Sequence, residues 1–193
     1  SSQSNGTITD EKLRSLMEGM PMMKNWRLLI NGLLDDGAKV AIVSGGLQQT
    51  AKDIAAQFPS SKPWSRRWGG IDRFTAGRFG EGYDSKLSVF TNGWLRGKRN
   101  SNGNYEVDDF GRYQVQMNGK GAIVKMLQRR YGISKDKTAS VGDSAGDIGM
   151  FQESALAICF NPWDKKPLEY CDEVVEQKDL AIVLDKITTK FSK

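Results

Sequence analysis

The chain of 193 residues contains no histidine, and this absence removes a large class of sites. Catalysis by Ser-His-Asp or Cys-His arrangements is excluded, and so are zinc sites that use histidine. Any chemistry must therefore come from carboxylates, lysines, hydroxyls and backbone amides, with help from a hard cation.

Cysteines and long apolar runs are also scarce. Cys159 and Cys171 do not make a disulfide framework, and a chain of this length can bury a core without such links. Cys159 lies in the apolar run LAICF, where we expect a reduced, buried thiol. No stretch approaches the roughly 18 to 20 apolar residues of a membrane span. The opening SSQSNGTITD has no apolar signal region, so we expect a cytoplasmic protein with no membrane partner.

The composition is that of one globular domain. With 38% hydrophobic and 26% charged residues, the chain fits neither a disordered nor a membrane-embedded class. The net charge of +5 suits an anionic substrate or a nucleic acid. We expect a single domain over residues 1–193, in which 59–117 form an insertion of a loop and a β-hairpin.

The first half of the chain shows an α/β pattern. Apolar residues at helical spacing over 24–36 predict a helix, which Gly37 ends. KVAIV, residues 39–43, predicts a buried parallel strand, followed by a turn at Ser44-Gly45-Gly46. A helix is then expected with these residues on one face: Leu47, Ala51, Ile54, Ala55 and Phe58.

The middle of the chain lacks a clean period. Residues 59–84 are rich in glycine, arginine and aromatics, which predicts a long ordered loop. KLSVFTNGWLRG (86–97) and NYEVDDFGRYQVQM (104–117) have strand-like composition, and SNGN (101–104) is a strong turn signal between them. We therefore expect a β-hairpin here.

The α/β pattern returns after residue 118. The sequence predicts helices over 119–131, around 148–155 and over 180–187, and strands over 138–141, 156–160 and 173–176. The expected fold is α/β, a Rossmann-like three-layer sandwich with a mainly parallel sheet.

Polar residues follow two of the predicted strands, where ligands bind in open α/β sheets. The hydroxyl of Ser44 and the amides of Gly45 and Gly46, at the start of a helix, would form an anion site. The alternative is a plain tight turn. In NGKG (118–121), Lys120 can reach a phosphate as a compact charge, although it could also be an ordinary surface lysine.

The second strand end carries two carboxylates. Asp143 ends the strand and Asp147 lies in the first helical turn, so both can converge on one cation such as Mg²⁺. The alternative is helix capping by Asp143 or Ser144. Capping does not explain why both acids occur beside the anion site, so we favour the metal site.

Together and in this order, the motifs resemble the haloacid dehalogenase superfamily, in its phosphoserine-phosphatase-like branch. The matching segments are AIVSGG (41–46), SVFTNGW (88–94), NGKGAIV (118–124), VGDSAGD (141–147) and ICFNPWDKKPLEYCDEVVEQKDL (158–180). The resemblance implies an Mg²⁺-dependent phosphomonoester hydrolase that forms an aspartyl-phosphate on a small phosphorylated, phosphoserine-like metabolite.

The resemblance also implies a role for each motif residue. Ser44 would bind the transferring phosphoryl group, and Lys120 would neutralise it and steady the nucleophile. Asp143 would ligate Mg²⁺, and Asp147 would hold the metal or its water.

The family's first motif, a strand followed by Asp-x-Asp-Gly-Thr, has one candidate here. In QSNGTIT, Gln3 takes the position of the nucleophile and Asn5 that of the acid/base. A carboxamide is a poor nucleophile and does not titrate near neutral pH. If this N-terminus is complete, we predict an inactive phosphate- and metal-binding module; otherwise an Asp-x-Asp strand lies in residues that the sequence omits. The other alternative is that SSQSNG is a tag remnant or tail.

Two structural expectations accompany this motif. Residues 1–5 contain no apolar side chain and cannot form the family's central strand, whose loss would leave a gap of about 10 Å at a strand spacing of ~4.8 Å. The family's helical cap follows this motif, and the short interval 10–23 predicts a reduced or absent cap.

Basic and aromatic residues interleave in the central loop and could bind a nucleic acid by stacking and charge. They are Trp64, Arg66, Arg67, Trp68, Arg73, Phe74, Arg78 and Phe79. We favour a loop that packs its aromatics over the sheet or the site, and we expect no nucleic-acid partner. The sequence does not decide the oligomeric state.

Overall fold

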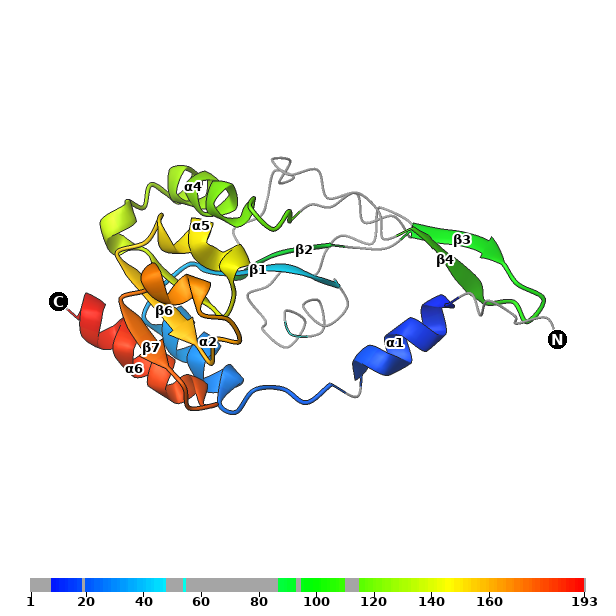
Figure 1. Cartoon of the computed structure of the whole chain (residues 1–193), viewed down its shortest axis with the longest axis horizontal. Helices are drawn as coiled ribbons and strands as arrows, with labels where there is room; N and C mark the ends of the chain where they lie inside the picture. Colours follow the sequence, from blue (N-terminus) through cyan, green and yellow to red (C-terminus); the bar gives the residue numbers. More distant parts are fainter. Residues whose placement is uncertain are drawn as a thin grey trace.

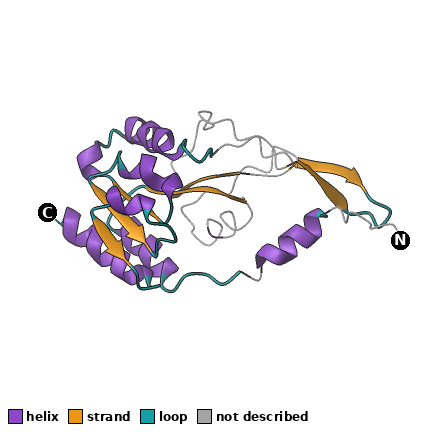
Figure 2. Ribbon diagram, in the orientation of Figure 1, coloured by secondary structure: helices purple, strands orange, loops and turns teal. Residues whose placement is uncertain are grey.

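A computed structural model describes residues 8–18, 20–47, 54, 87–92, 95–109 and 115–192, and its elements follow an α/β order (Figures 1 and 2). The first half contains α1 (Asp10–Glu18), α2 (Trp26–Asp35), β1 (Val40–Leu47), β2 (Leu87–Asn92), β3 (Leu95–Arg99) and β4 (Tyr105–Asp109). The second half contains α4 (Lys120–Tyr131), η1 (Lys135–Lys137), β5 (Ala139–Gly142), η2 (Ala145–Asp147), α5 (Ile148–Phe151), β6 (Leu156–Phe160), η3 (Lys166–Glu169), β7 (Glu173–Val175) and α6 (Leu180–Phe191).

The strands next to the helices are parallel. β1 pairs with β2, and β5, β6 and β7 form a second sheet in that order. The predicted α/β class with parallel pairing is therefore confirmed. Among the described strands, none pairs with both β1 and β5, so the described parallel strands fall into two sheets.

Two packed helices, α2 and α6, join the sheets. Trp26, Ile30 and Leu34 of α2 form one core cluster with β2, and Leu180 of α6 packs against that cluster. In return, Leu29 of α2 packs against the cluster that α6 forms with β6 and β7. Each sheet is therefore covered by side chains from both helices.

A polar contact at their ends fixes these helices to each other. The Asp179 carboxylate accepts hydrogen bonds from Lys24 Nζ at 2.6 Å and from Asn25 Nδ2 at 2.7 Å. These two side chains and the Ala181 amide lower the pKa of Asp179 to about 2. The Leu180 amide also donates to the Lys24 carbonyl at 3.0 Å, so backbone and side chains hold the same junction.

The strand β1 corrects one expectation. The sequence predicted a turn at Ser44–Gly46, but β1 continues to Leu47 because Ser44 pairs with Thr91 and Leu47 with Asn92 of β2. The pairing is irregular between Ser44 and Leu47, which accommodates the two glycines. Of the residues predicted on the next helix, the structure describes two. Leu47 lies in β1 and not in a helix, whereas Ile54 is helical and packs against the α2 cluster.

The hairpin prediction is confirmed in part. β3 and β4 are antiparallel, and Gly103 in their turn has a φ of 83°, which favours glycine. The Asn100 side chain accepts hydrogen bonds from two amides of the turn. Residues 87–92, however, form β2 and pair in parallel with β1, so this half of the predicted hairpin strand belongs to the core. The loop 59–84 lies outside the described residues.

The elements after residue 118 lie within a few residues of their predicted bounds. Near the N-terminus, α1 occupies the interval in which a reduced cap was expected, and it lies beside β4, away from the two parallel sheets (Figure 1). None of the described helices is long and apolar enough to cross a membrane.

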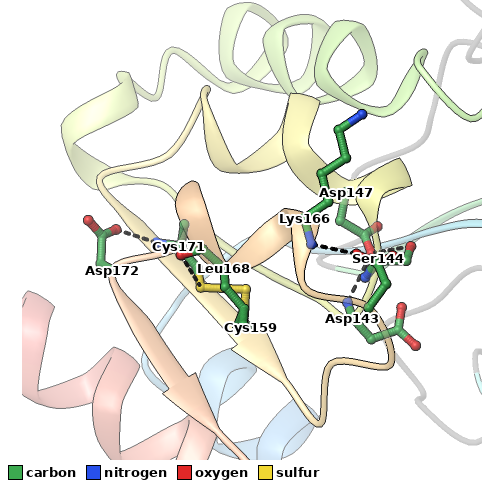
Figure 3. Close-up of a disulfide and its surroundings, with 10 residues drawn as sticks. Asp143, Ser144, Asp147, Cys159, Lys166, Leu168, Cys171 and Asp172 are labelled. Carbon is green, nitrogen blue, oxygen red and sulfur yellow. Dashed lines mark hydrogen bonds between the residues drawn. A yellow bond between two sulfur atoms is a disulfide. The ribbon is translucent and has the colours of Figure 1, made fainter.

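The expectation of a reduced thiol at Cys159 is wrong, because Cys159 and Cys171 form a disulfide (Figure 3). Their Cα atoms are 5.8 Å apart, within the range that a disulfide spans. Residue 171 returns to β6 because Asp172 and Ala157 exchange two hydrogen bonds, Asp172 N to Ala157 O and Ala157 N to the Asp172 carboxylate. The local apolar context of Cys159 contained no sign of this return.

We expect Gly121→Ala to destabilise the protein by about 2 kcal/mol, because α4 and α5 approach closely at this residue. A Cβ at Gly121 would overlap the carbonyl of Gly149 on α5, where the backbone cannot move without shifting the helix. Urea unfolding measures the change. Gly119→Ala is the matched control, since its Cβ would meet its nearest atom at 3.4 Å, and an equal loss in both variants would contradict the prediction.

Candidate functional site

The loop 143–147, which follows β5, is organised around the buried carboxylate of Asp147. Its Oδ2 accepts hydrogen bonds from Asp143 N at 2.9 Å, from Ser144 N at 3.1 Å and from Ser144 Oγ at 3.1 Å. Asp147 and Ser144 together form a capping box at the start of η2. The capping alternative is therefore realised, but by Asp147 with Ser144 and not by Asp143.

Lys120, the first residue of α4, is paired with the other oxygen of the same carboxylate. Its Nζ lies 2.6 Å from Asp147 Oδ1, and the two side chains are only 14% and 3% exposed. Burial alone would raise the pKa of Asp147. The hydrogen bond and charge of Lys120, with the Asp143 and Ser144 amides, outweigh burial and lower this pKa. Asp147 is thus a buried, ionised carboxylate whose two oxygens are both engaged.

Asp143 has a different environment, although it lies in the same loop. It is exposed and lines a pocket of about 200 Å³ together with Val141, Phe160 and Asn161. Its carboxylate points away from the disulfide (Figure 3). Partial burial and the charge of Asp147 raise the pKa of Asp143. A cation at this position would relieve that repulsion.

The comparisons with known proteins agree on one family. Residues 106–187 match the family of haloacid dehalogenase-like hydrolases. The chain is 36% identical over 75 residues to a phosphoserine phosphatase from Methanocaldococcus jannaschii, and 37% identical over 67 residues to one from Wolinella succinogenes. These matches cover 38% and 34% of this chain. They span about a third of each relative, 34% and 31% of its length.

Solved structures extend the likeness to most of the chain. A phospho-aspartyl intermediate analogue of phosphoserine phosphatase has a TM-score of 0.66 and 25% identity, over 93% of this chain and 71% of that one. The apo form of a phosphoserine phosphatase has a TM-score of 0.64 and 24% identity, over 93% and 74% of the two chains. The fold is haloacid dehalogenase-like. The resemblance that the motifs indicated is thereby confirmed.

The haloacid dehalogenase-like family implies Mg²⁺, and the described residues fit this ion through one carboxylate. Mg²⁺ is held by one or two carboxylates, several waters and phosphate oxygens. Asp143 can supply such a ligand, whereas both oxygens of Asp147 are already engaged by Lys120 and N–H or O–H donors. No group of three acidic or cysteine side chains gathers in the described part of the chain. The residues thus favour Asp143 as the direct ligand and Asp147 as the residue that holds its loop.

The structure brings only part of the predicted set together. Lys120, Asp143 and Asp147 lie together, because Lys120 pairs with the Asp147 carboxylate and that carboxylate also accepts from the Asp143 amide. The end of β1 lies near the segment before α4, since Val43 packs with the cluster containing Val115 and a Cβ on Gly45 would meet the Val115 carbonyl at 3.9 Å. Residues 44–46 lie in β1 rather than at the start of a helix. They therefore do not form the anion site of helix N-terminal amides that the sequence predicted.

Two further groups of predicted residues lie outside the described residues. They are the first-motif candidates Gln3 and Asn5, and the basic and aromatic residues of the central loop. Their predicted roles remain predictions.

Sequence reasoning missed one residue beside the loop 143–147, Asp164. Its Oδ2 accepts a hydrogen bond from the Ala145 amide at 3.1 Å, within the loop that carries both acids. Next to it, the Trp163 amide donates to the Asp143 carbonyl at 3.2 Å. Asp164 lies in the segment 158–180 that carries the resemblance. Neither that match nor the turn composition of Asn-Pro-Trp-Asp after a strand reveals what its carboxylate contacts.

Proposed function

We propose that the protein is a phosphomonoester hydrolase that acts on a small phosphorylated metabolite through an aspartyl-phosphate. The observation that carries the proposal is the buried ion pair of Lys120 and Asp147 beside the exposed carboxylate of Asp143. This arrangement supports the proposal because the ammonium group of Lys120 and a carboxylate that could ligate a metal lie at the same strand end. The relatives named phosphoserine phosphatase make phosphoserine the first substrate to test.

Lys120 can serve Asp147 and a phosphate at once. An ammonium group has three N–H donors, and Asp147 Oδ1 takes one of them. The others can donate to phosphoryl oxygens, while Asp147 keeps the ammonium in one place. In the proposed site, Ser44 and the amides of Gly45 and Gly46 contribute further donors from β1.

Asp143 would hold Mg²⁺, whose chemistry is to neutralise charge on the transferring phosphoryl group. Partial burial and, after it, the charge of Asp147 raise the pKa of Asp143, and cation binding favours its ionised form. The loop around it is fixed by Asp147, so the ligand is held in place before the ion arrives.

A second function is favoured by the residues at the first motif. An aspartyl-phosphate needs a carboxylate nucleophile, and Gln3 and Asn5 are both carboxamides. With these residues in the motif's positions, the protein would bind phosphate and metal without turnover.

Hydrolysis of p-nitrophenyl phosphate with Mg²⁺, together with calorimetry of phosphate binding, separates the two functions. Turnover above that of Asp143→Ala supports the hydrolase. Saturable, Mg²⁺-dependent phosphate binding without turnover supports the binding module. Gln3→Asp with Asn5→Asp should then create activity if these residues occupy the positions of the two aspartates in the first motif. A chain that neither hydrolyses nor binds contradicts both.

A further inference from the structure

The segment between β6 and β7 packs on the site loop. We call residues 161–170 the strap, and its helical turn η3 contacts η2 of the site loop. Asn161, at its start, has a φ of 46° and donates from its amide to the Val175 carbonyl at 2.6 Å. At its other end, the disulfide joins Cys171 to β6 (Figure 3). Both ends of the strap are therefore tied to the sheet.

Within the strap, Asp164 is itself held rigidly. Its Oδ1 accepts a hydrogen bond from the Lys166 amide at 2.9 Å, while Oδ2 accepts from Ala145 at 3.1 Å. One carboxylate thus joins the backbone of the strap to that of the site loop. Hydrogen bonds from amides to an ionised carboxylate are about twice as strong as neutral ones.

The site loop is consequently held from two sides. From within, Asp147 binds the amides of Asp143 and Ser144. From the strap, Asp164 binds the Ala145 amide, and the Trp163 amide binds the Asp143 carbonyl. Loss of the strap contacts would leave the hydrogen bonds that Asp147 accepts from the loop amides. It would remove the hydrogen bonds that hold the loop from the strap.

We propose that Asp164 is a positioning residue, which fixes the backbone of Asp143 so that its carboxylate is directed for cation binding. This inference rests on the proposed function, in which Asp143 holds Mg²⁺. Among the residues that the structure describes, Asp143 is the single carboxylate proposed to bind the ion directly, so cation binding there depends strongly on how Asp143 is held.

The test is calorimetric titration of the full chain with Mg²⁺ alone. We expect Asp164→Ala to raise the Kd for Mg²⁺ by about tenfold to a hundredfold, the usual effect of losing a residue that orients a ligand. Asp164→Asn, which keeps one carbonyl oxygen, should recover part of the loss. Circular dichroism confirms that each variant is folded.

Asp172→Ala is the matched control. Asp172 accepts a hydrogen bond from the Ala157 amide at 2.7 Å, at the other end of β6 from the site. Its loss should lower stability without changing the Kd. An unchanged Kd in folded Asp164→Ala, or an equal rise in Asp172→Ala, overturns the proposal for Asp164 alone. A wild-type chain that does not bind Mg²⁺ overturns the proposed metal site as well.

Discussion

Replacing Lys120 by methionine is expected to lower the free energy of unfolding by about 3 kcal/mol, measured by urea denaturation at pH 7. Methionine keeps most of the apolar stem but removes the ammonium. The carboxylate of Asp147, 3% exposed, would then remain buried without its counter-charge. Removing one partner of a buried pair costs far more than removing an exposed one, because the remaining charge is uncompensated.

Two further variants test whether the loss of stability comes from the buried Lys120–Asp147 pair. In Lys120→Met with Asp147→Asn, no charge is left behind, and the loss should be smaller than in Lys120→Met alone. Lys125→Met breaks the Lys125–Glu153 pair, in which Lys125 is 54% exposed, and should change stability by less than about 0.5 kcal/mol. Equal effects of Lys120→Met and Lys125→Met would refute a special role for the buried pair.

The same pair predicts how stability changes with pH. The pKa of Asp147 is lowered in the folded protein, so its contribution is present above the unfolded value of ~3.9 and is lost as pH falls through the folded pKa. In Lys120→Met, burial is no longer opposed by the ammonium, and the pKa of Asp147 should rise. The folded variant then binds its proton more tightly than the unfolded chain. Its stability deficit relative to wild type should therefore shrink as pH is lowered from 7 towards ~4.

Reduction of the Cys159–Cys171 disulfide by a dithiol is expected to lower the free energy of unfolding by about 2 to 3 kcal/mol. The bridge closes a loop with a sequence separation of 12, and the reduced unfolded chain regains the freedom that this loop removes. Cys159 is completely buried, so its reduced thiol stays within the core. Urea unfolding with and without the dithiol measures the difference.

Cys171→Ser supplies the control for reduction, since it cannot form the bridge and replaces the more accessible sulfur. Its stability should match that of the reduced wild type and should not respond to the dithiol. A wild-type unfolding curve that is the same with and without the dithiol would count against the predicted stabilisation.

The sequence was most informative where local pattern and tertiary packing agree. The helix over 119–131 and the strand over 156–160 were predicted correctly because their apolar residues are those that the core buries. The strand β1 was predicted too short. Ser44, Gly45 and Gly46 near its end gave no strand signal, and this end is held in the strand because Ser44 and Leu47 pair with β2, more than 40 residues later in the chain.

The sequence predicted which residue types form the candidate site but not which of these residues contact one another. The spacing of Asp143 and Asp147 fits both a cation site and a capping box, and only the position of Lys120 shows that Asp147 is engaged. Asp164 and the disulfide depend on how the strap returns to the sheet. No local periodicity encodes that return, because it is set by hydrogen bonds of Asp172 to β6 and of Asn161 to β7, the strands on either side of the strap.

The junction of α2 and α6 bears on the order in which the chain can fold during synthesis. Leu29 and Leu180 each pack into the cluster of the opposite sheet, and a Cβ on Gly32 would meet the Leu184 side chain at 2.8 Å. The part of α2 that carries Leu29 and Gly32 therefore lacks its α6 partner until residues 180–184 have been synthesised. We infer that a nascent chain exposes this part of α2 until α6 is made, and that loss of α6 would destabilise α2 as well as the strands that α6 covers.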